Sequence, residues 1–259
     1  KGINRSKIVN VPLWTSSCLL HALTAITNVT VKNTKADSLI VVHKWGITYK
    51  IKKSISLKKS LIIEDSADSF PRKSYRPFEN NSNYEMISLP KLLGSFCGGI
   101  ILTNNQNFYT YAKTLQIKNK TLANKQSLRK FISAFKDNKN ADWRFYESLN
   151  HSLDYNSVEN IYGCLPNYKI NLRTIIRREK LIKTHFKNIF TDKKRVGPCI
   201  IFDGKKFDQF KSLLEKKHFD VNKNVVKENF KKCFIFPIHF GIPENSFKNL
   251  FNSLIKISK

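Results

Sequence analysis

One lysine of the sequence stands in surroundings that could give it chemistry. Lys91 lies in an apolar segment, residues 87–101, in which the pair Gly98-Gly99 opens a predicted strand. Glycine lets the backbone approach a ligand closely. A lysine in apolar surroundings loses its proton more easily than one in water, and it can then attack a carbonyl carbon. Because the chain has 46 Lys and Arg residues, Lys91 is distinguished by this environment and not by its residue type.

Two neighbouring carboxylates form a second candidate. Glu64 and Asp65 directly follow the apolar run at residues 61–63. In an open α/β sheet, ligands bind just beyond the carboxyl ends of the strands, so a carboxylate at this position can face a cofactor. The alternative is that Glu64 or Asp65 caps the next helix. The residues alone leave both interpretations open.

The elements that would position these residues follow from the hydrophobic pattern. Strands are predicted at residues 8–11, 29–31, 38–42, 61–63, 86–89 and 99–103, with a helix at residues 15–26 that Ser16 or Ser17 would cap. Continuous apolar strands separated by helices indicate a mostly parallel sheet that is covered on both faces. The first part of the chain is therefore predicted to be a three-layer α/β domain.

The second part of the chain has a different pattern. Residues 104–153 are polar and mainly helical in character, and a long basic helix is predicted at residues 172–190. After it come strands at 199–202 and 234–238 and helices at 207–217 and 246–257. We therefore predict a large domain over residues 1–165 and a small C-terminal α+β domain over residues 166–259.

Two of these segments together resemble a known cofactor site. The pair "IIEDSADS" and "SLPKLLGSFCGG" is similar to the pyridoxal-phosphate (PLP) site of the DegT/DnrJ/EryC1/StrS family of sugar aminotransferases. In that family an aspartate ends a strand, and a lysine lies eight residues before the second glycine of a Gly-Gly pair, a spacing that Lys91 and Gly99 keep. The segments "VPLWTSSCLLHAL", "VVHKWG" and "FPIHFGIPENSFKNLFNSLIKI" also resemble family segments, in the family's order. The resemblance extends from about residue 2 to residue 258.

The resemblance implies roles for individual residues. Lys91 would be the Schiff-base lysine, Asp65 would bind the pyridine nitrogen, and Trp14 would stack on the cofactor ring, although Trp14 also fits an ordinary core position. For His43, a structural role is as good an interpretation as a role in the cofactor site. The remaining cofactor contacts implied by position are Ser88 for the phosphate, Asp68 where the family has Gln or His, and Asn156 of Tyr155-Asn156 for the partner subunit's site, with Asn167-Tyr168 as the alternative.

The fold and function implied are those of a PLP-dependent transferase. The resemblance implies an aminotransferase that acts as a homodimer on a nucleotide-linked keto sugar, with glutamate as amino donor, in cell-surface polysaccharide synthesis. Three departures favour an alternative, a degenerate relative that binds PLP weakly or serves as a partner subunit. Cys97 replaces an acid, Asp68 replaces Gln or His, and the family's phosphate-binding turn would precede Lys1, so the N-terminal part of the large domain is expected to be missing.

Composition bounds the remaining possibilities. The net charge of +27 could indicate nucleic-acid binding, but the basic residues are spread along the chain, which favours a compositional origin and no nucleic-acid partner. A positive field would still attract a nucleotide-linked substrate. None of the five cysteines forms a CxxC pair, so no metal site is predicted. Without a signal peptide or a long apolar run, the protein is predicted to be cytoplasmic, with no membrane insertion.

Overall fold

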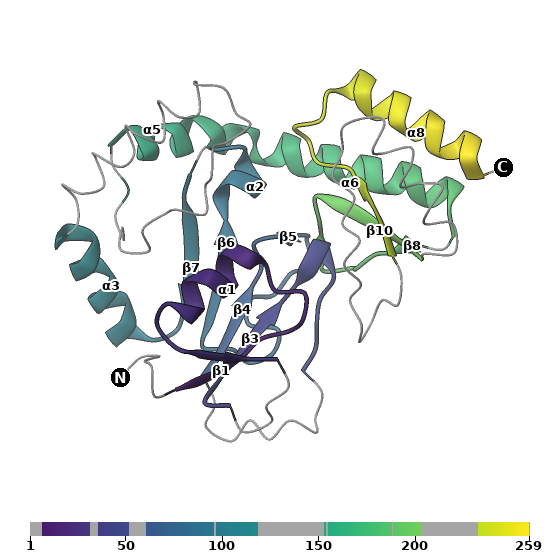
Figure 1. The fold of residues 1–259 in the computed structure, drawn as a ribbon. Helices are drawn as coiled ribbons and strands as arrows, with labels where there is room; N and C mark the ends of the chain where they lie inside the picture. Colours follow the sequence, from purple (N-terminus) through teal and green to yellow (C-terminus); the bar gives the residue numbers. More distant parts are fainter. Residues whose placement is uncertain are drawn as a thin grey trace.

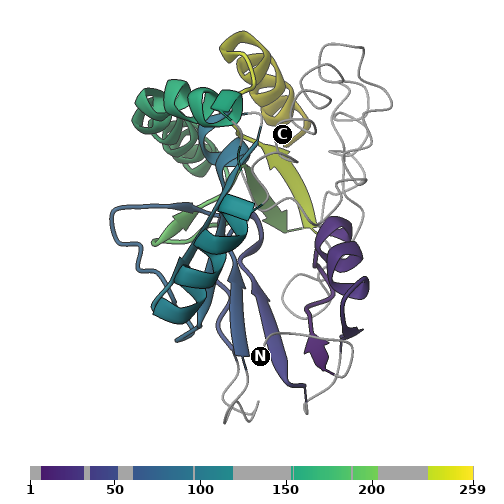
Figure 2. The ribbon, with the colours of Figure 1, turned by 90° about the vertical axis from the view of Figure 1, so that its left-hand side faces the viewer.

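A computed structural model describes residues 7–31, 36–51, 61–95, 97–118, 153, 155–187, 189–203 and 233–258. Figure 1 shows a larger sheet with α1 and α3 beside it, and a smaller unit in which α6 and α8 lie next to β8 and β10. The turned view in Figure 2 shows the strands of the larger sheet nearly upright, with α1 to one side of them.

The larger sheet has six strands in the order β2-β1-β3-β4-β6-β7. Their bounds are β1 Ile8–Asn10, β2 Asn28–Thr30, β3 Ser38–Val42, β4 Leu61–Asp65, β6 Tyr84–Ser88 and β7 Gly99–Thr103. All neighbouring pairs are parallel except β6 and β7, which are antiparallel. The predicted mostly parallel α/β sheet is confirmed. The carboxyl ends of β1, β3, β4 and β6 therefore lie at one edge of the sheet.

The apolar strands owe their pattern to a buried core. Val9, Ile40 and Val42 are buried together with Val11 and Leu23. Leu23 belongs to α1 (Ser17–Thr24), which begins after Ser16, whose hydroxyl accepts a hydrogen bond from the Leu19 N–H. The cap was predicted correctly, but the helix is two residues shorter at each end than expected. Burial of the strands by such helices explains why polar residues do not alternate along them.

The C-terminal part forms an α+β unit, as predicted. It contains α5 (Tyr155–Cys164), the 3₁₀ turn η3 (Leu165–Asn167), α6 (Tyr168–His185), β8 (Ile189–Phe190), β10 (Cys199–Asp203), β11 (Cys233–Pro237) and α8 (Glu244–Ser258). The antiparallel sheet β11-β10-β8 buries Phe202, Phe234 and Phe236 against α8. The same core includes Leu92 and Leu93 from the larger part, and the boundary at residue 165 stays a prediction.

Some expectations fall outside the described residues. The helix predicted at 207–217 lies there, as does most of the polar stretch at 104–153, of which α3 (Gln106–Lys118) is described. Three short strands were not predicted. β5 (Phe70–Pro71) and β9 (Arg195–Val196) pair with each other, and β8 takes the place of the end of the helix predicted at 172–190, since α6 ends at His185. The strand expected at 86–89 is wrong at its end. Leu89 begins the helix α2 (Leu89–Leu93), since Pro90 suits the first turn of a helix and cannot donate in a sheet.

Gly46 offers a test of how the strand ends are packed. It has φ +80°, and a Cβ placed there would lie 2.1 Å from the Gly197 backbone nitrogen. We expect Gly46→Ala to lower the free energy of unfolding by about 3 kcal/mol, because both the left-handed backbone and the contact resist a side chain. The measurement is urea denaturation. Gly163→Ala in α5 is the control, since nothing lies within 4 Å of its added Cβ; a loss as large as that of Gly46→Ala would contradict the argument.

Candidate active site

The last residue of β4 is a buried carboxylate. Asp65 is 8% exposed, and its Oδ1 accepts a hydrogen bond of 2.9 Å from the Ala67 N–H. Burial raises the pKa of Asp65 and the charge of Asp68 raises it further, while Lys91 and Lys44 act in the opposite direction. Among the described side chains none forms an ion pair with Asp65. The site therefore holds a desolvated carboxylate that a cationic group would stabilise.

Lys91 lies close to this carboxylate, in the segment that follows the neighbouring strand β6. It belongs to α2, which follows β6, and its Nζ lies 2.5 Å from Oδ1 of Asp68. Its side chain is 48% exposed, whereas that of Asp68 is 15% exposed. Burial alone would raise the pKa of Asp68, but Lys44 and Lys91 together lower it below its usual value. The structure thus brings Asp65, Asp68 and Lys91 to one edge of the sheet, with the lysine amine reachable from solvent.

The short helix α2 explains why Lys91 faces outward. Leu89, Leu92 and Leu93 are buried, so the helix is fixed by one apolar face and Lys91 occupies the other. The helix ends at Gly94, whose φ of 80° is left-handed and suits a glycine cap.

A contact from the C-terminal part holds the backbone of Lys91. The His239 Nδ1 accepts from the Gly241 N–H, so its Nε2 carries the proton and donates to the Lys91 carbonyl at 3.0 Å. Burial lowers the pKa of His239. The buried Arg178 in turn donates to the carbonyls of His239 and Ile242. The "FPIHFG" segment thus supports the candidate lysine, a contact that the sequence did not predict.

A buried polar network lies next to Asp65. Glu64 accepts from His43 Nε2 at 2.7 Å and from the Asn80 N–H at 2.8 Å. Burial opposes ionisation of Glu64, but these hydrogen bonds lower its pKa overall. Since His43 Nδ1 accepts from the Tyr49 N–H and His43 is fully buried, His43 has a structural role here. The suggestion that Glu64 caps a helix is wrong, because Glu64 is engaged with His43 and Asn80 instead.

Arg195 fastens the same region to the C-terminal part. Its guanidinium donates to Ser66 Oγ at 2.8 Å and to Glu85 Oε1 at 3.0 Å, while Ser66 also donates to Glu85. All three side chains are buried. Such a charged network is costly to break, since each group would be left desolvated and unpaired. The loop that follows Asp65 is therefore held in one conformation.

The other predicted cofactor residues lie at varied positions. Trp14 donates from Nε1 to the Val42 carbonyl at 3.3 Å and borders a pocket of about 110 Å³. Val42 pairs with Asp65 in the sheet register, so the Trp14 indole lies one strand away from the carboxylate. Ser88 precedes α2, and its side chain makes no capping hydrogen bond.

Of the two asparagine candidates, Asn156 lies in α5 and Asn167 directly precedes α6. The helix α5 lies close to Gly98, which follows α2 in the chain: a Cβ added at Gly98 would lie 2.8 Å from Cδ1 of Ile161 in α5.

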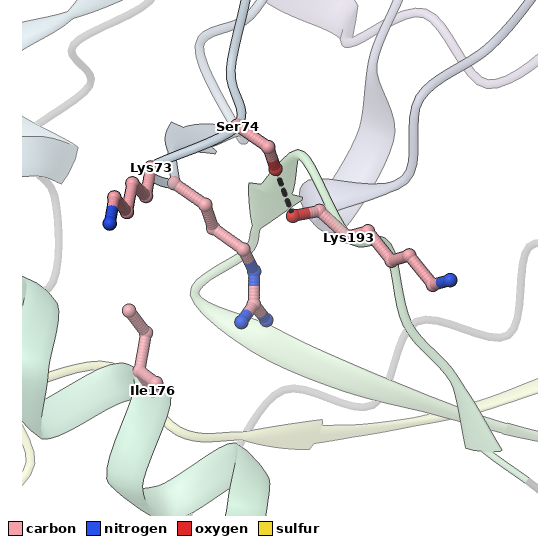
Figure 3. Close-up of a pocket in the computed structure, with 5 residues that line it drawn as sticks. Lys73, Ser74, Ile176 and Lys193 are labelled. Carbon is pink, nitrogen blue, oxygen red and sulfur yellow. Dashed lines mark hydrogen bonds between the residues drawn. The ribbon is translucent and has the colours of Figure 1, made fainter.

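A larger pocket, of about 540 Å³, lies away from Lys91 and is lined by Arg72, Lys73, Ser74, Ile176 and Lys193. Figure 3 shows the ammonium groups of Lys73 and Lys193 directed to opposite sides, with Ile176 on the helix below them. Arg72 is already paired with the buried Glu179. None of the residues that line this pocket therefore provides a buried, unpaired cation that could bind an anion.

Comparisons with known proteins agree with this geometry. A family model described as "Putative PLP-dependent aminotransferase" matches residues 2–258. The chain belongs to this family of PLP-dependent aminotransferases, so the predicted enzyme class and cofactor are confirmed. No curated protein matches the sequence significantly.

Solved structures of sugar aminotransferases share the fold. A DegT/DnrJ/EryC1/StrS aminotransferase from Brucella abortus is 11% identical, with a TM-score of 0.63 over 98% of this chain and 80% of that one. The aminotransferase TlmJ from Streptoalloteichus hindustanus is 10% identical, with a TM-score of 0.64 over 99% and 80% of the two chains. The sugar aminotransferase CalS13 from Micromonospora echinospora is 10% identical, with a TM-score of 0.59 over 96% and 80%. The predicted DegT-type fold is confirmed. Over the described residues, no helix is long and apolar enough to cross a membrane.

Proposed function

We propose that the protein transfers an amino group from glutamate to the keto group of a nucleotide-linked sugar, using Lys91 and Asp65 at the edge of the parallel sheet. The observation that carries the proposal is the grouping of a solvent-accessible amine and a buried carboxylate in a chain of this enzyme family. PLP supplies a ring that accepts electrons from the substrate carbon. Every other contribution comes from residues of the chain.

The residues present fit the cofactor. Asp65 has a raised pKa and no ion-pair partner among the described residues. A protonated pyridine nitrogen would be a suitable ion-pair partner for it. Lys91 has a half-exposed ammonium that must release Asp68 and lose its proton before it can bond a carbonyl carbon. The Ser88 hydroxyl, which makes no capping hydrogen bond to α2, would bind the phosphate. Trp14 would supply an aromatic wall, and Asn156 would reach toward the partner subunit's site.

The substrate class rests on charge and on likeness. The structural neighbours include proteins described as sugar aminotransferases, and the net charge of +27 would attract a negatively charged nucleotide. As the role we propose the supply of aminated sugars for cell-surface polysaccharide synthesis. We also propose a homodimer, the commonest closed assembly, for which light scattering should give twice the chain mass of 30.1 kDa.

The test is amination of a substrate panel. Purified protein with PLP and glutamate should aminate nucleotide-linked keto sugars at least about tenfold faster than the same sugars without the nucleotide, because the nucleotide adds binding energy that free sugars lack. Mass spectrometry of the products measures this. Amination of keto acids alone would refute the sugar substrate. Failure to bind PLP would instead favour the degenerate, partner-subunit alternative.

A further inference from the structure

The carboxylate beside Lys91 has a second cationic partner. Asp68 uses its two oxygens separately, with Oδ1 at 2.5 Å from Lys91 Nζ and Oδ2 at 3.0 Å from Lys44 Nζ. The Lys44 side chain is 16% exposed and that of Lys91 is 48% exposed. One carboxylate therefore bridges a sheltered ammonium and an accessible one. Of the two lysines, Lys91 is the more accessible to a molecule in solution.

An unusual backbone turn places Lys44 at this position. Lys44 opens the 3₁₀ turn η1 (Lys44–Gly46) directly after β3, and Trp45 within it has φ 53° and ψ 34°. A bulky residue in the left-handed region is strained, and such strain persists only when the surroundings enforce it. Here Gly46 packs against the backbone of Gly197, where there is no room for a Cβ. The turn is therefore held firmly while it presents the Lys44 ammonium to Asp68.

A neighbouring hydrogen bond ties the two segments together. The hydroxyl of Ser69 donates to the His43 carbonyl at 2.7 Å, and both residues are buried. Each is adjacent in sequence to one member of the Lys44–Asp68 pair. The pair is thus fixed by backbone geometry on both sides, unlike a surface ion pair that forms and breaks freely.

We propose that Lys44 is a positioning residue of the active site, which remains paired with Asp68 when Lys91 gives up its ion pair to react. This inference rests on the proposed function. In that reaction the Lys91 ammonium would first lose a proton to solvent. The resulting amine would then form a C=N bond to the aldehyde carbon of the cofactor, with the aldehyde oxygen and the two amine hydrogens leaving as water. If the new C=N nitrogen is neutral, Asp68 loses one cation, and Lys44 spares it from becoming a buried, unpaired charge.

The charges that face this group come from several elements. Asp65 at the end of β4 adds a second carboxyl group, Lys44 and Lys91 add positive charges, and His239 contacts the Lys91 carbonyl from the C-terminal part. Because His239 Nδ1 accepts from a backbone N–H, this ring is neutral in the structure. Among the described side chains, the charged groups nearest the Lys91 nitrogen are therefore two carboxyl groups and Lys44.

The experiment is a pH titration of the visible absorbance of the PLP-loaded protein, which reports protonation of the Lys91–cofactor linkage. Lys44→Gln should raise the midpoint by about one pH unit, since removing a nearby cation favours the protonated linkage. Lys44→Arg should keep the wild-type midpoint. In an Asp68→Asn background, Lys44→Gln should shift the midpoint by less than half as much, because Lys44 is then no longer held at the site.

The outcomes separate this inference from the proposed function. A folded Lys44→Gln protein with the wild-type midpoint overturns the role of Lys44 alone. An equal shift in the Asp68→Asn background shows that Lys44 does not act through Asp68, and it overturns the inference too. If Lys44→Gln does not fold, Lys44→Arg decides, and a midpoint shifted by a full unit despite the kept charge refutes it. Absence of a visible band from the wild-type protein overturns the proposed function itself.

Discussion

Replacement of Lys91 by alanine is expected to abolish covalent attachment of PLP and to lower the rate of amino transfer by at least about 10⁴-fold, because it removes the amine that we propose makes the covalent bond. Lys91 is the more exposed of the two lysines whose amines contact Asp68 beside the buried Asp65. Reduction with borohydride, followed by peptide mapping, should find the cofactor on Lys91 in the wild-type protein. The rate of the half-reaction with glutamate is followed from the absorbance of the cofactor.

The fold should survive this change, so that the loss can be assigned to chemistry. Asp68 keeps Lys44 as its partner in the Lys91→Ala protein, and the apolar face of α2 is untouched. Lys73→Ala is a matched control, because Lys73 is an exposed lysine that lines the separate pocket near α6. Label found on a lysine other than Lys91, or a Lys91→Ala protein as active as the control, would show that the assignment is wrong.

The positions of Asp65 and Lys91 at one edge of the sheet could be predicted because both residues lie at strand ends. Asp65 ends β4, and Lys91 lies three residues beyond the end of β6, its neighbour in the sheet. Parallel strands bring their carboxyl ends to one edge of the sheet, so residues that follow neighbouring strands lie close together in the fold. The end of the strand before Leu89 was misjudged because the apolar run continues from β6 into α2. Pro90 indicates the start of a helix and could have corrected this prediction.

The contacts made across long sequence separations could not be predicted. Arg195 lies 129 residues from Ser66, and His239 lies 148 residues from Lys91, whose carbonyl it contacts. The local pattern does not show what either residue contacts, since their partners are set by how the C-terminal part packs. Lys44 was hidden for another reason: in a chain with 46 basic residues, one lysine after a strand carries no signal. The strands β5 and β9, of two residues each, are too short to show a periodicity.

Replacement of Asp65 by asparagine should lower the rate of the glutamate half-reaction by about 10³-fold, or about 4 kcal/mol in the barrier, while the protein still folds. Asparagine keeps an oxygen that can accept from the Ala67 N–H, but it cannot hold a positive charge on the pyridine nitrogen. The electron-accepting power of the ring then falls. Stopped-flow absorbance with saturating PLP separates this loss of rate from weaker cofactor binding.

The pKa of Asp65 predicts that stability will change in the opposite direction from activity. Because burial raises this pKa above the unfolded value, ionisation of Asp65 destabilises the cofactor-free protein above that pKa, and Asp65→Asn should melt no lower than wild type at pH 7. Asp192→Asn is the contrasting control. Hydrogen bonds from the Thr48 and Lys194 N–H groups outweigh burial and lower the pKa of Asp192. The charge of Asp192 therefore stabilises the fold at a pH above the pKa in the unfolded state. This stability is lost as the pH falls through the pKa in the folded state. Asp192→Asn should therefore melt lower and keep its rate, and an Asp65→Asn protein that melts lower but reacts normally would make Asp65 a structural residue.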